Sequence, residues 1–451
     1  MTDNPADRLF KDYPNIIRAG VSMKEPNEVI PIYGGEFKLI QGQNEIEVVG
    51  EINFIWFPDS GAHFSGEVKG NSIDIAQLLT GSEKFTLIID GIEFGECLIT
   101  RTSFGDGANI AGTLIETAVK GDKSIPVSKI RFSIPNFRDF LGLPVRDNTW
   151  SGRNRIKFEN DDYIIIIDKR RDFKEVRELL TSKGGYLTLW NGELTRKKGN
   201  ILFDDLHSIL HCFSIFLSFL NGRRCSPLFI QGLHDNEVIW TDYSDRFVDP
   251  FKSAPSWPQS HSVAGLEELW KKFSTIWKDE DDRDFLVTAI HWYVVANSHS
   301  GLSEGAIIMT QTGLELIYNW LIIEKQKLLA GNDAENIAAS NKIRLILSHL
   351  KVKFDIPDSF TQLKSIPSTI DAPDAFVQIR NAIVHSQEEK RKKLREMHYM
   401  AKYDALQLGL WYIELALLKI LDFDGVYHNR CIRGVYSSQC DVRVPWTSGN
   451  S

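Results

Sequence analysis

The sequence predicts an α+β protein: a β-rich, antiparallel N-terminal domain of sandwich-like or barrel-like form, followed by an all-α helical bundle. Two observations predict this fold class. Between about residues 30 and 194, short runs rich in Val, Ile and Phe alternate with turn signals. Beyond a Pro- and Ser-rich stretch at 250–262, apolar residues recur at helical spacing. We therefore assign a β-rich domain to residues 1–249, a linker to 250–262 and a helical domain to 263–451.

In the first domain, strands are expected between tight turns such as Asp90-Gly91. In chain order the expected strands are Glu45–Phe57, Phe85–Ile89, Cys97–Phe104, Ile110–Val119, Ile130–Phe137, Tyr163–Ile167 and Tyr186–Trp190. The expected helices are Ile73–Leu79, Phe173–Thr181 with Gly184 as its C-cap, and the strongly periodic Ile201–Leu220. A hairpin at Leu228–Ile230 and Val238–Thr241 is expected to close the domain.

In the second domain, helical periodicity is nearly continuous. The expected helices are Leu266–Trp277, Phe285–Ala296, Ser303–Lys325, Ile337–Leu350, one around residues 375–385, and a long final helix, Lys390–Leu421. In that final helix, Leu394, Ala401, Leu408 and Leu415 repeat every seven residues. This spacing is typical of the seam of a helical bundle, so we interpret the stripe as core packing.

Composition places the chain among soluble globular proteins, with 43% hydrophobic and 25% charged residues. The formal net charge of -8 argues against a protein that coats nucleic acid non-specifically, although it allows a local basic site. The five cysteines lack CxxC spacing and are expected to be reduced thiols. The first residues lack a signal peptide pattern, and the most apolar segment, Ile209–Leu220, is too short to span a bilayer. We expect a cytoplasmic protein without a membrane partner.

One segment carries a candidate chemistry: Arg380-Asn381-Ala382-Ile383-Val384-His385. An arginine binds phosphate through a planar fork of donors that stays charged, and a histidine exchanges protons near neutral pH. On a helix, Arg380, Asn381 and His385 fall on the polar side, with Arg380 and His385 about 140° apart. They converge on one phosphate if the helix ends near His385, or if a second copy of the helix faces the first.

Two valines, Val377 and Val384, are expected to flank Arg380 on the same face. Apolar residues beside a polar motif suggest that another subunit covers it. The sequence therefore predicts a homodimer through the C-terminal helices.

The segment resembles the R-N-x-x-x-H motif of the HEPN family, an all-α family that carries the motif near its C-terminus between two long helices. The resemblance covers roughly the last third to two-fifths of the chain, judged by helical periodicity. The Arg-x4-His core is short, and the asparagine and the flanking helices add specificity. A β-rich region ahead of a HEPN domain is also the layout of the ApeA-type anti-phage defence proteins, which is a likeness of architecture alone.

This resemblance implies a ribonuclease that needs no cofactor and commonly works as a dimer. RNA supplies its own nucleophile, the 2′-hydroxyl, so the enzyme moves protons and stabilises charge. His385 would transfer a proton, Arg380 would neutralise the phosphate and Asn381 would support the geometry. The products would carry 2′,3′-cyclic phosphate and 5′-hydroxyl ends. RNA is the expected partner, with tRNA and mRNA as candidate classes, and a phage-derived molecule is the expected trigger.

Two further features are candidates for supporting roles. HEPN proteins often place a polar residue of a neighbouring helix near the motif, and Glu315 is the candidate for it, although a surface role is the more common one for such a residue. The basic run Lys390, Arg391, Lys392 and Lys393 directly follows the motif. Such a run is usually a solvated face, but next to a phosphate site it suggests binding of the RNA backbone.

Metal sites are not expected. His207 and His211 have i, i+4 spacing but lack a third ligand beside them, and His428, Cys431 and Cys440 lack the spacing of common zinc sites. Two alternatives to a ribonuclease stay open. The helical domain could be a non-catalytic HEPN-like module for dimerisation or RNA binding, with the β domain binding a protein or ligand. It could also be an unrelated helical scaffold in which the motif arose by chance.

Overall fold

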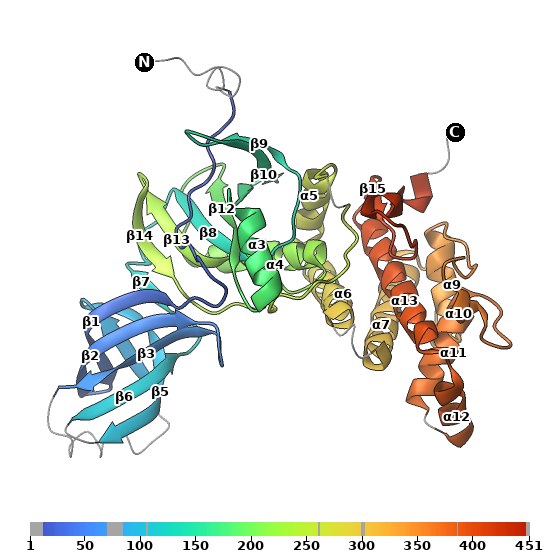
Figure 1. Ribbon diagram of the computed structural model, residues 1–451, viewed down its shortest axis with the longest axis horizontal. Helices are drawn as coiled ribbons and strands as arrows, with labels where there is room; N and C mark the ends of the chain where they lie inside the picture. The colour runs from blue at the N-terminus through green and yellow to red at the C-terminus, as the bar shows by residue number, and fades with distance from the viewer. Residues whose placement is uncertain are drawn as a thin grey trace. The chain divides into compact units, whose positions relative to one another are not determined.

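The computed structural model describes residues 12–69, 84–104, 107–259, 262–298, 303–385 and 387–447. The chain divides into two compact units. The first contains the described residues up to Arg138, together with Gly142–Ser214 and Cys225–Lys252. The second contains Asp139–Leu141, Ile215–Arg224 and the described residues from Ser253 onwards. The first unit is rich in strands and the second is helical, so the α+β prediction is confirmed (Figure 1).

A closed barrel of antiparallel strands forms part of the first unit, in the order β1-β2-β3-β6-β5-β4 with β4 pairing back to β1. Its strands are β1 Ile30–Gln41, β2 Asn44–Ile55, β3 Gly61–Val68, β4 Phe85–Ile89, β5 Ile92–Phe104 and β6 Ala108–Leu114. Glycines let neighbouring strands approach closely: a Cβ on Gly66 would lie 2.5 Å from the Val49 carbonyl oxygen. Closure leaves the barrel without free sheet edges.

An eight-stranded sheet forms the rest of this unit, in the order β7-β14-β13-β8-β12-β11-β10-β9. Its strands are β7 Val119–Gly121, β8 Lys129–Pro135, β9 Leu143–Arg146, β10 Ser151–Glu159, β11 Tyr163–Lys169, β12 Thr188–Arg196, β13 Leu228–His234 and β14 Glu237–Asp242. The helix α3, Phe173–Lys183, connects β11 to β12, and α4, Leu206–Asn221, connects β12 to β13. The predicted hairpin is confirmed as β13–β14.

Several sequence predictions for this unit need correction. The strands β1, β3, β9 and β10 were not predicted, because their glycines and charged residues dilute the apolar signal. The predicted Ile110–Val119 strand is two strands, β6 and β7. Helix α4 begins at Leu206 because Ile201 instead bridges to Val127. Gly184 does cap α3, with its N–H bonded to the Leu180 carbonyl. The expected helix Ile73–Leu79 lies outside the described residues.

The second unit is a bundle of helices (Figure 1). Its elements are α5 Leu266–Ile276, α6 Glu280–Ser298, α7 Ser303–Ile317, the π-helical η1 Tyr318–Lys325, α8 Asn332–Glu335, α9 Ala339–His349, α10 Thr361–Lys364, α11 Ala372–Val384, α12 Glu388–Glu396, α13 Tyr399–Ile420, β15 Val426–His428, η2 Ser437–Cys440, β16 Asp441–Arg443 and η3 Pro445–Thr447. Helix α13 is central, and α6, α7, α10 and α11 all contact it. Three of the four residues of the predicted seam, Ala401, Leu408 and Leu415, are buried in α13, whereas Leu394 lies in α12 and is half-buried.

A buried polar network also fixes α13. Arg430 donates from Nε to Glu414 Oε2 at 2.9 Å, from Nη2 to Glu414 Oε1, and from Nη1 to Gln407 Oε1 at 3.1 Å. The Tyr293 hydroxyl on α6 donates to Glu414 Oε1 at 2.7 Å. Every partner here is hydrogen-bonded, so the network joins α6, α13 and the C-terminal segment without leaving a bare charge.

One segment of the described chain, Ser303–Lys325, is long and apolar enough to cross a membrane by length and composition. In the structure 56% of its most apolar window is buried inside the protein. A helix in the core of a globular protein passes the same test of length and composition.

Candidate functional site

The motif helix α11 begins at a well-defined cap. The Asp371 carboxylate accepts the Asp374 backbone N–H at 3.0 Å, and Pro373 occupies the first turn. The same carboxylate receives two bonds from Arg344 of α9, at 2.7 and 2.8 Å. One acidic side chain thus starts α11 and ties it to α9.

One side of α11 packs into the bundle. Its buried residues include Ala375, Phe376, Ile379 and Ala382, as the apolar spacing predicted. A Cβ on Gly409 of α13 would lie 2.5 Å from Thr310 Cγ2 of α7 and 2.7 Å from Phe376 Cε2. The glycine therefore lets three helices meet beneath the motif.

The motif side chains lie at the other side and at the C-terminal end of α11. Arg380 and Asn381 are half-buried, and Arg380 Nη1 donates to Asn381 Oδ1 at 3.0 Å. The buried Arg380 Nε has no hydrogen-bond partner among the described residues. His385 is exposed and is the C-cap residue, with its N–H bonded to the Asn381 carbonyl at 3.0 Å. The helix therefore ends at His385. A helix end at this point is one of the two arrangements in which Arg380 and His385 were expected to converge on one phosphate.

The C-terminal end of α11 lies where α7 and α13 begin. Glu304 and Lys402, near the starts of α7 and α13, form an ion pair of 2.7 Å, so these helices run parallel. Helix α11 runs in the opposite direction. Burial raises the pKa of Tyr412 on α13, and the carboxylate of Asp371, the N-cap of α11, adds to that shift, so the start of α11 lies near Tyr412. Phe376, further along α11, contacts Gly409, which comes earlier in α13. Two helix N-termini, which carry partial positive charge, and the C-terminus of α11, which carries partial negative charge, therefore lie at this end of the bundle.

The two valines differ from the prediction. Val384 is 42% exposed, but Val377 is only 8% exposed because it packs within its own chain. Of the two valines, therefore, only Val384 could be covered by another subunit.

Glu315 is held away from the motif residues. Its carboxylate accepts from Gln311 Nε2 at 3.0 Å and from Lys342 Nζ of α9 at 2.7 Å. Within the described part of the chain, it makes no hydrogen bond or ion pair with the motif residues. The structure thus gives Glu315 a role in joining α7 to α9.

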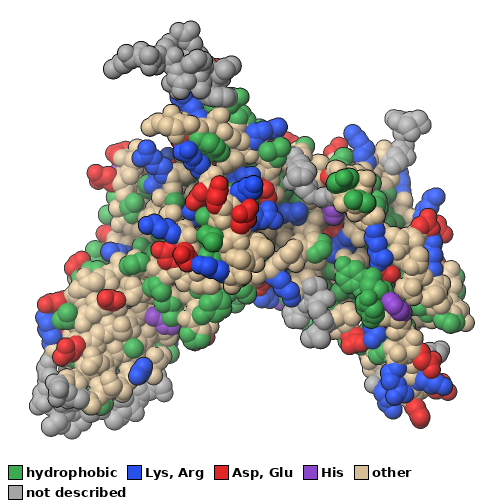
Figure 2. Space-filling model, viewed as in Figure 1, with side chains coloured by type: hydrophobic (Ala, Val, Ile, Leu, Met, Phe, Trp, Pro, Cys, Tyr) green, Lys and Arg blue, Asp and Glu red, His purple; other side chains and the backbone are tan. Residues whose placement is uncertain are grey.

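The basic run forms α12, which contacts α11. Arg391, Lys392 and Arg395 are exposed and Lys390 is half-buried, while the side chain of Lys393 lies outside the described part. Figure 2 shows Lys and Arg side chains gathered at the lower right, with acidic ones among them, where α12 lies in Figure 1. The motif is therefore followed at once by an exposed, predominantly basic helix.

The single final helix predicted from Lys390 to Leu421 is wrong. It is two helices, α12 and α13, separated at Met397 and His398. His398 has extended backbone angles, and its Nδ1 accepts the Met400 N–H at 3.2 Å. A histidine acting as an N-cap is not visible in apolar periodicity, which explains why the break was missed.

The histidine pairs weighed in the sequence can now be placed. The rings of His207 and His211 on α4 are 6.3 Å apart, and His428 Nδ1 lies 3.2 Å from Asp441 Oδ1. Among the described residues, no group of three or more His, Cys, Asp or Glu side chains has the geometry of a metal site.

Two family models match this chain. The model of the YopA central domain matches residues 122–254, and that of the YopA C-terminal domain matches residues 279–441. The chain is 29% identical over 433 residues to the SPbeta prophage-derived uncharacterized protein YopA of Bacillus subtilis (strain 168). That similarity covers 93% of this chain and 95% of the relative. No solved structure matches. The motif residues thus lie within the part that is similar to the YopA C-terminal domain.

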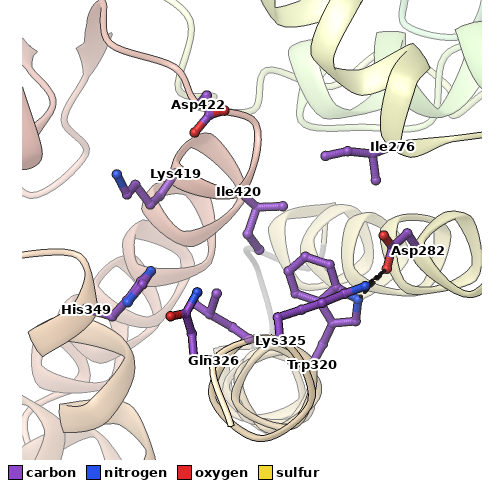
Figure 3. Close-up of a pocket in the computed structure, with 10 residues that line it drawn as sticks. Ile276, Asp282, Trp320, Lys325, Gln326, His349, Lys419, Ile420 and Asp422 are labelled. Carbon is purple, nitrogen blue, oxygen red and sulfur yellow. Dashed lines mark hydrogen bonds and ion pairs between the residues drawn. The ribbon is translucent and has the colours of Figure 1, made fainter. Parts of the chain in front are cut away.

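A pocket of about 480 Å³ in the helical unit was not predicted (Figure 3). Its lining residues come from α5, α6, η1, α9 and α13 and from the residues that follow η1 and α13. Because many segments contribute one to three side chains each, no local pattern could have indicated it. It lies at the C-terminal end of α13, whereas the motif lies near its N-terminal end. The 22 residues of α13 span about 33 Å.

Proposed function

We propose that the helical unit is a metal-independent endoribonuclease of the HEPN type. It would cut RNA by attack of the 2′-hydroxyl and leave 2′,3′-cyclic phosphate and 5′-hydroxyl ends. One observation carries the proposal: Arg380 and Asn381 are joined by a hydrogen bond, with His385 exposed where their helix ends. Phosphate binding and proton transfer are therefore available at one end of one helix.

The contacts suggest a role for each residue. The Asn381 carbonyl oxygen orients the Arg380 guanidinium, which leaves the Asn381 amide donors for a phosphate oxygen. Arg380 neutralises the charge that develops on the phosphorane. His385 is exposed and able to exchange protons with the 2′-hydroxyl or the leaving 5′-oxygen. The α12 basic residues bind the RNA backbone on either side of the cut.

The first test is cleavage of total RNA in EDTA. We expect His385→Ala to lower the rate by about 10²–10⁴-fold, the usual contribution of a proton-transfer residue. Arg380→Lys should lower it by about 10²-fold or more, because lysine keeps the charge but loses the fork. Asn381→Ala should be milder. His234→Ala, at an exposed histidine of the other unit, is the matched control and should cleave like wild type.

The products distinguish this mechanism from others. A substrate with 2′-deoxyribose at the cut site should resist, because the attacking oxygen is missing. Cleavage of that substrate, or a strict requirement for Mg²⁺, would contradict the proposal. If no protein cleaves but RNA still binds, and binding needs α12, the helical unit is an RNA-binding module instead.

We also propose that the enzyme acts as a homodimer, in which the second copy supplies a second His385. The exposed Val384 beside the motif supports this arrangement. If the cleft needs both copies of His385, a mixed dimer of one wild-type chain and one His385→Ala chain should be inactive. Adding an excess of His385→Ala chains to the wild type should therefore lower its activity more than the same excess of His234→Ala chains does. Unchanged activity is incompatible with a shared cleft, and a monomer that cleaves at full rate is incompatible with the dimer.

The biological setting that we propose is abortive defence against phage in the cytoplasm, with the β-rich unit sensing a phage-derived molecule. The similarity to a prophage-derived protein supports a place in phage–host conflict. Expression during phage infection should degrade cellular RNA and arrest growth with the wild type but not with His385→Ala. Equal protection by both proteins would exclude RNA cleavage as the cause.

A further inference from the structure

The pocket at the far end of α13 contains two basic side chains, Lys419 and His349, besides Lys325. Its two carboxylates are already matched: Asp282 holds Lys325 Nζ at 2.6 Å, and Asp422 holds Lys272 Nζ at 3.0 Å. Lys419 and His349 have no carboxylate within 4.0 Å in the described part of the chain. Among the described residues, Lys419 thus brings to the pocket a positive charge without a carboxylate partner, and its Nζ lies 5.5 Å from the centre of the Trp446 ring.

These two groups share one side of the pocket. Figure 3 shows Lys419, His349 and Gln326 on one side, with Trp320, Lys325 and Asp282 on the other. Burial lowers the pKa of His349, and the neighbouring Lys419 lowers it further. An anion between them would relieve that repulsion, and the Gln326 amide adds further hydrogen-bond donors.

The opposite side of the pocket is rigid. Trp320 stacks on Phe285 with ring centroids 4.2 Å apart, and its indole N–H donates to Asp282 at 3.0 Å. Trp320 belongs to η1, and the Gln326 N–H bonds to the Leu321 carbonyl five residues back at 3.0 Å. Such π-helical turns are rare and frequently occur at functional sites.

We propose that this pocket binds a small organic phosphate of about nucleotide size. A phosphate monoester carries a charge of about -1.5 to -2, which matches Lys419 together with a protonated His349. The apolar side chains of Ile276, Leu321 and Ile420 supply a surface for the organic part. The volume of about 480 Å³ is within the usual range of small-molecule sites. This proposal goes beyond RNA cleavage and does not depend on it.

Titration calorimetry of the full chain with AMP, adenosine and inorganic phosphate tests this assignment. We expect saturable binding of AMP and much weaker binding of adenosine and of phosphate alone. Lys419→Gln should weaken AMP binding by about tenfold or more, since a charge-assisted contact is lost. His349→Asn should also weaken it. Lys353→Gln makes the same charge change at an exposed lysine outside the pocket and should bind like wild type.

Three results would overturn the assignment: no saturable binding of AMP, equal affinity for adenosine and AMP, or unchanged AMP affinity in Lys419→Gln. Circular dichroism on each variant separates a lost contact from a lost fold. The two pocket variants alter different helices, so if one misfolds the other still decides the outcome.

Discussion

The buried bond between Arg430 and Glu414 offers a direct test of how the bundle supports the motif helix. Arg430→Met removes the guanidinium and keeps a side chain of similar length. Glu414, which is fully buried, then retains the Tyr293 hydroxyl but loses both of its bonds to Arg430. A buried carboxylate without its counter-ion is strongly disfavoured, and breaking one partner of such a pair costs about 3–5 kcal/mol.

The size of the effect on melting follows from the size of the unit. For a unit of about 210 residues, each kcal/mol of lost stability lowers the unfolding midpoint by about 2–4 °C, so Arg430→Met should lower it by about 6–20 °C. The assay is thermal unfolding followed by the helical circular dichroism signal. The double variant Arg430→Met with Glu414→Leu should lose less than Arg430→Met alone, because the stranded charge is gone. A shift below about 2 °C, or a double variant less stable than the single one, would refute this reasoning.

Three further outcomes are expected. Asp371→Ala should lower the free energy of unfolding, measured with denaturant, by about 1–3 kcal/mol, because α11 loses its N-cap and Arg344 loses its partner. Gly409→Ala should lower the free energy of unfolding by about 1–3 kcal/mol, because the new methyl would lie 2.7 Å from Phe376. With α11 displaced, the variant should also cleave RNA more slowly. A variant as stable and as active as the wild type would contradict this prediction. The lowered pKa of His349 means that the folded state binds its proton less readily. Its stabilising effect is therefore present above the unfolded pKa of about 6.5 and is lost as pH falls below that value, so unfolding between pH 7.5 and 5.5 should be less pH-dependent in His349→Gln.

Local periodicity predicted the elements whose apolar residues are dense. Helix α11 and the seam of α13 were readable, because one face of each must be buried. The strand β3 was missed because Gly66 lies where neighbouring strands approach closely, and β1 was missed because Gly34 and Gly35 interrupt its apolar run; glycine weakens the strand signal in both. Tertiary contacts, rather than local propensity, decide those segments.

In the candidate site, too, features set by local helix geometry could be predicted and features set by packing could not. That Arg380 and His385 share the accessible side of α11 could be predicted, since helical geometry alone determines it. That Val377 is buried and that Glu315 pairs with Lys342 could not, because both depend on where α9 and α13 pack. The pocket could not be predicted either, since its residues come from separate elements.

The two proton transfers in the proposed reaction give a chemical reason for the proposed dimer. Cleavage by the 2′-hydroxyl needs one group to take a proton and one to return a proton to the 5′-oxygen. At this end of the described bundle, His385 is exposed, while His398 accepts the Met400 N–H through Nδ1. That bond fixes His398 as the N-cap of α13, so moving its ring toward RNA would cost the helix its cap. A second His385 from a partner chain supplies the missing group without that cost, so a mixed dimer that keeps only one His385 should be inactive, and adding His385→Ala chains to the wild type tests the proton balance as well as the assembly.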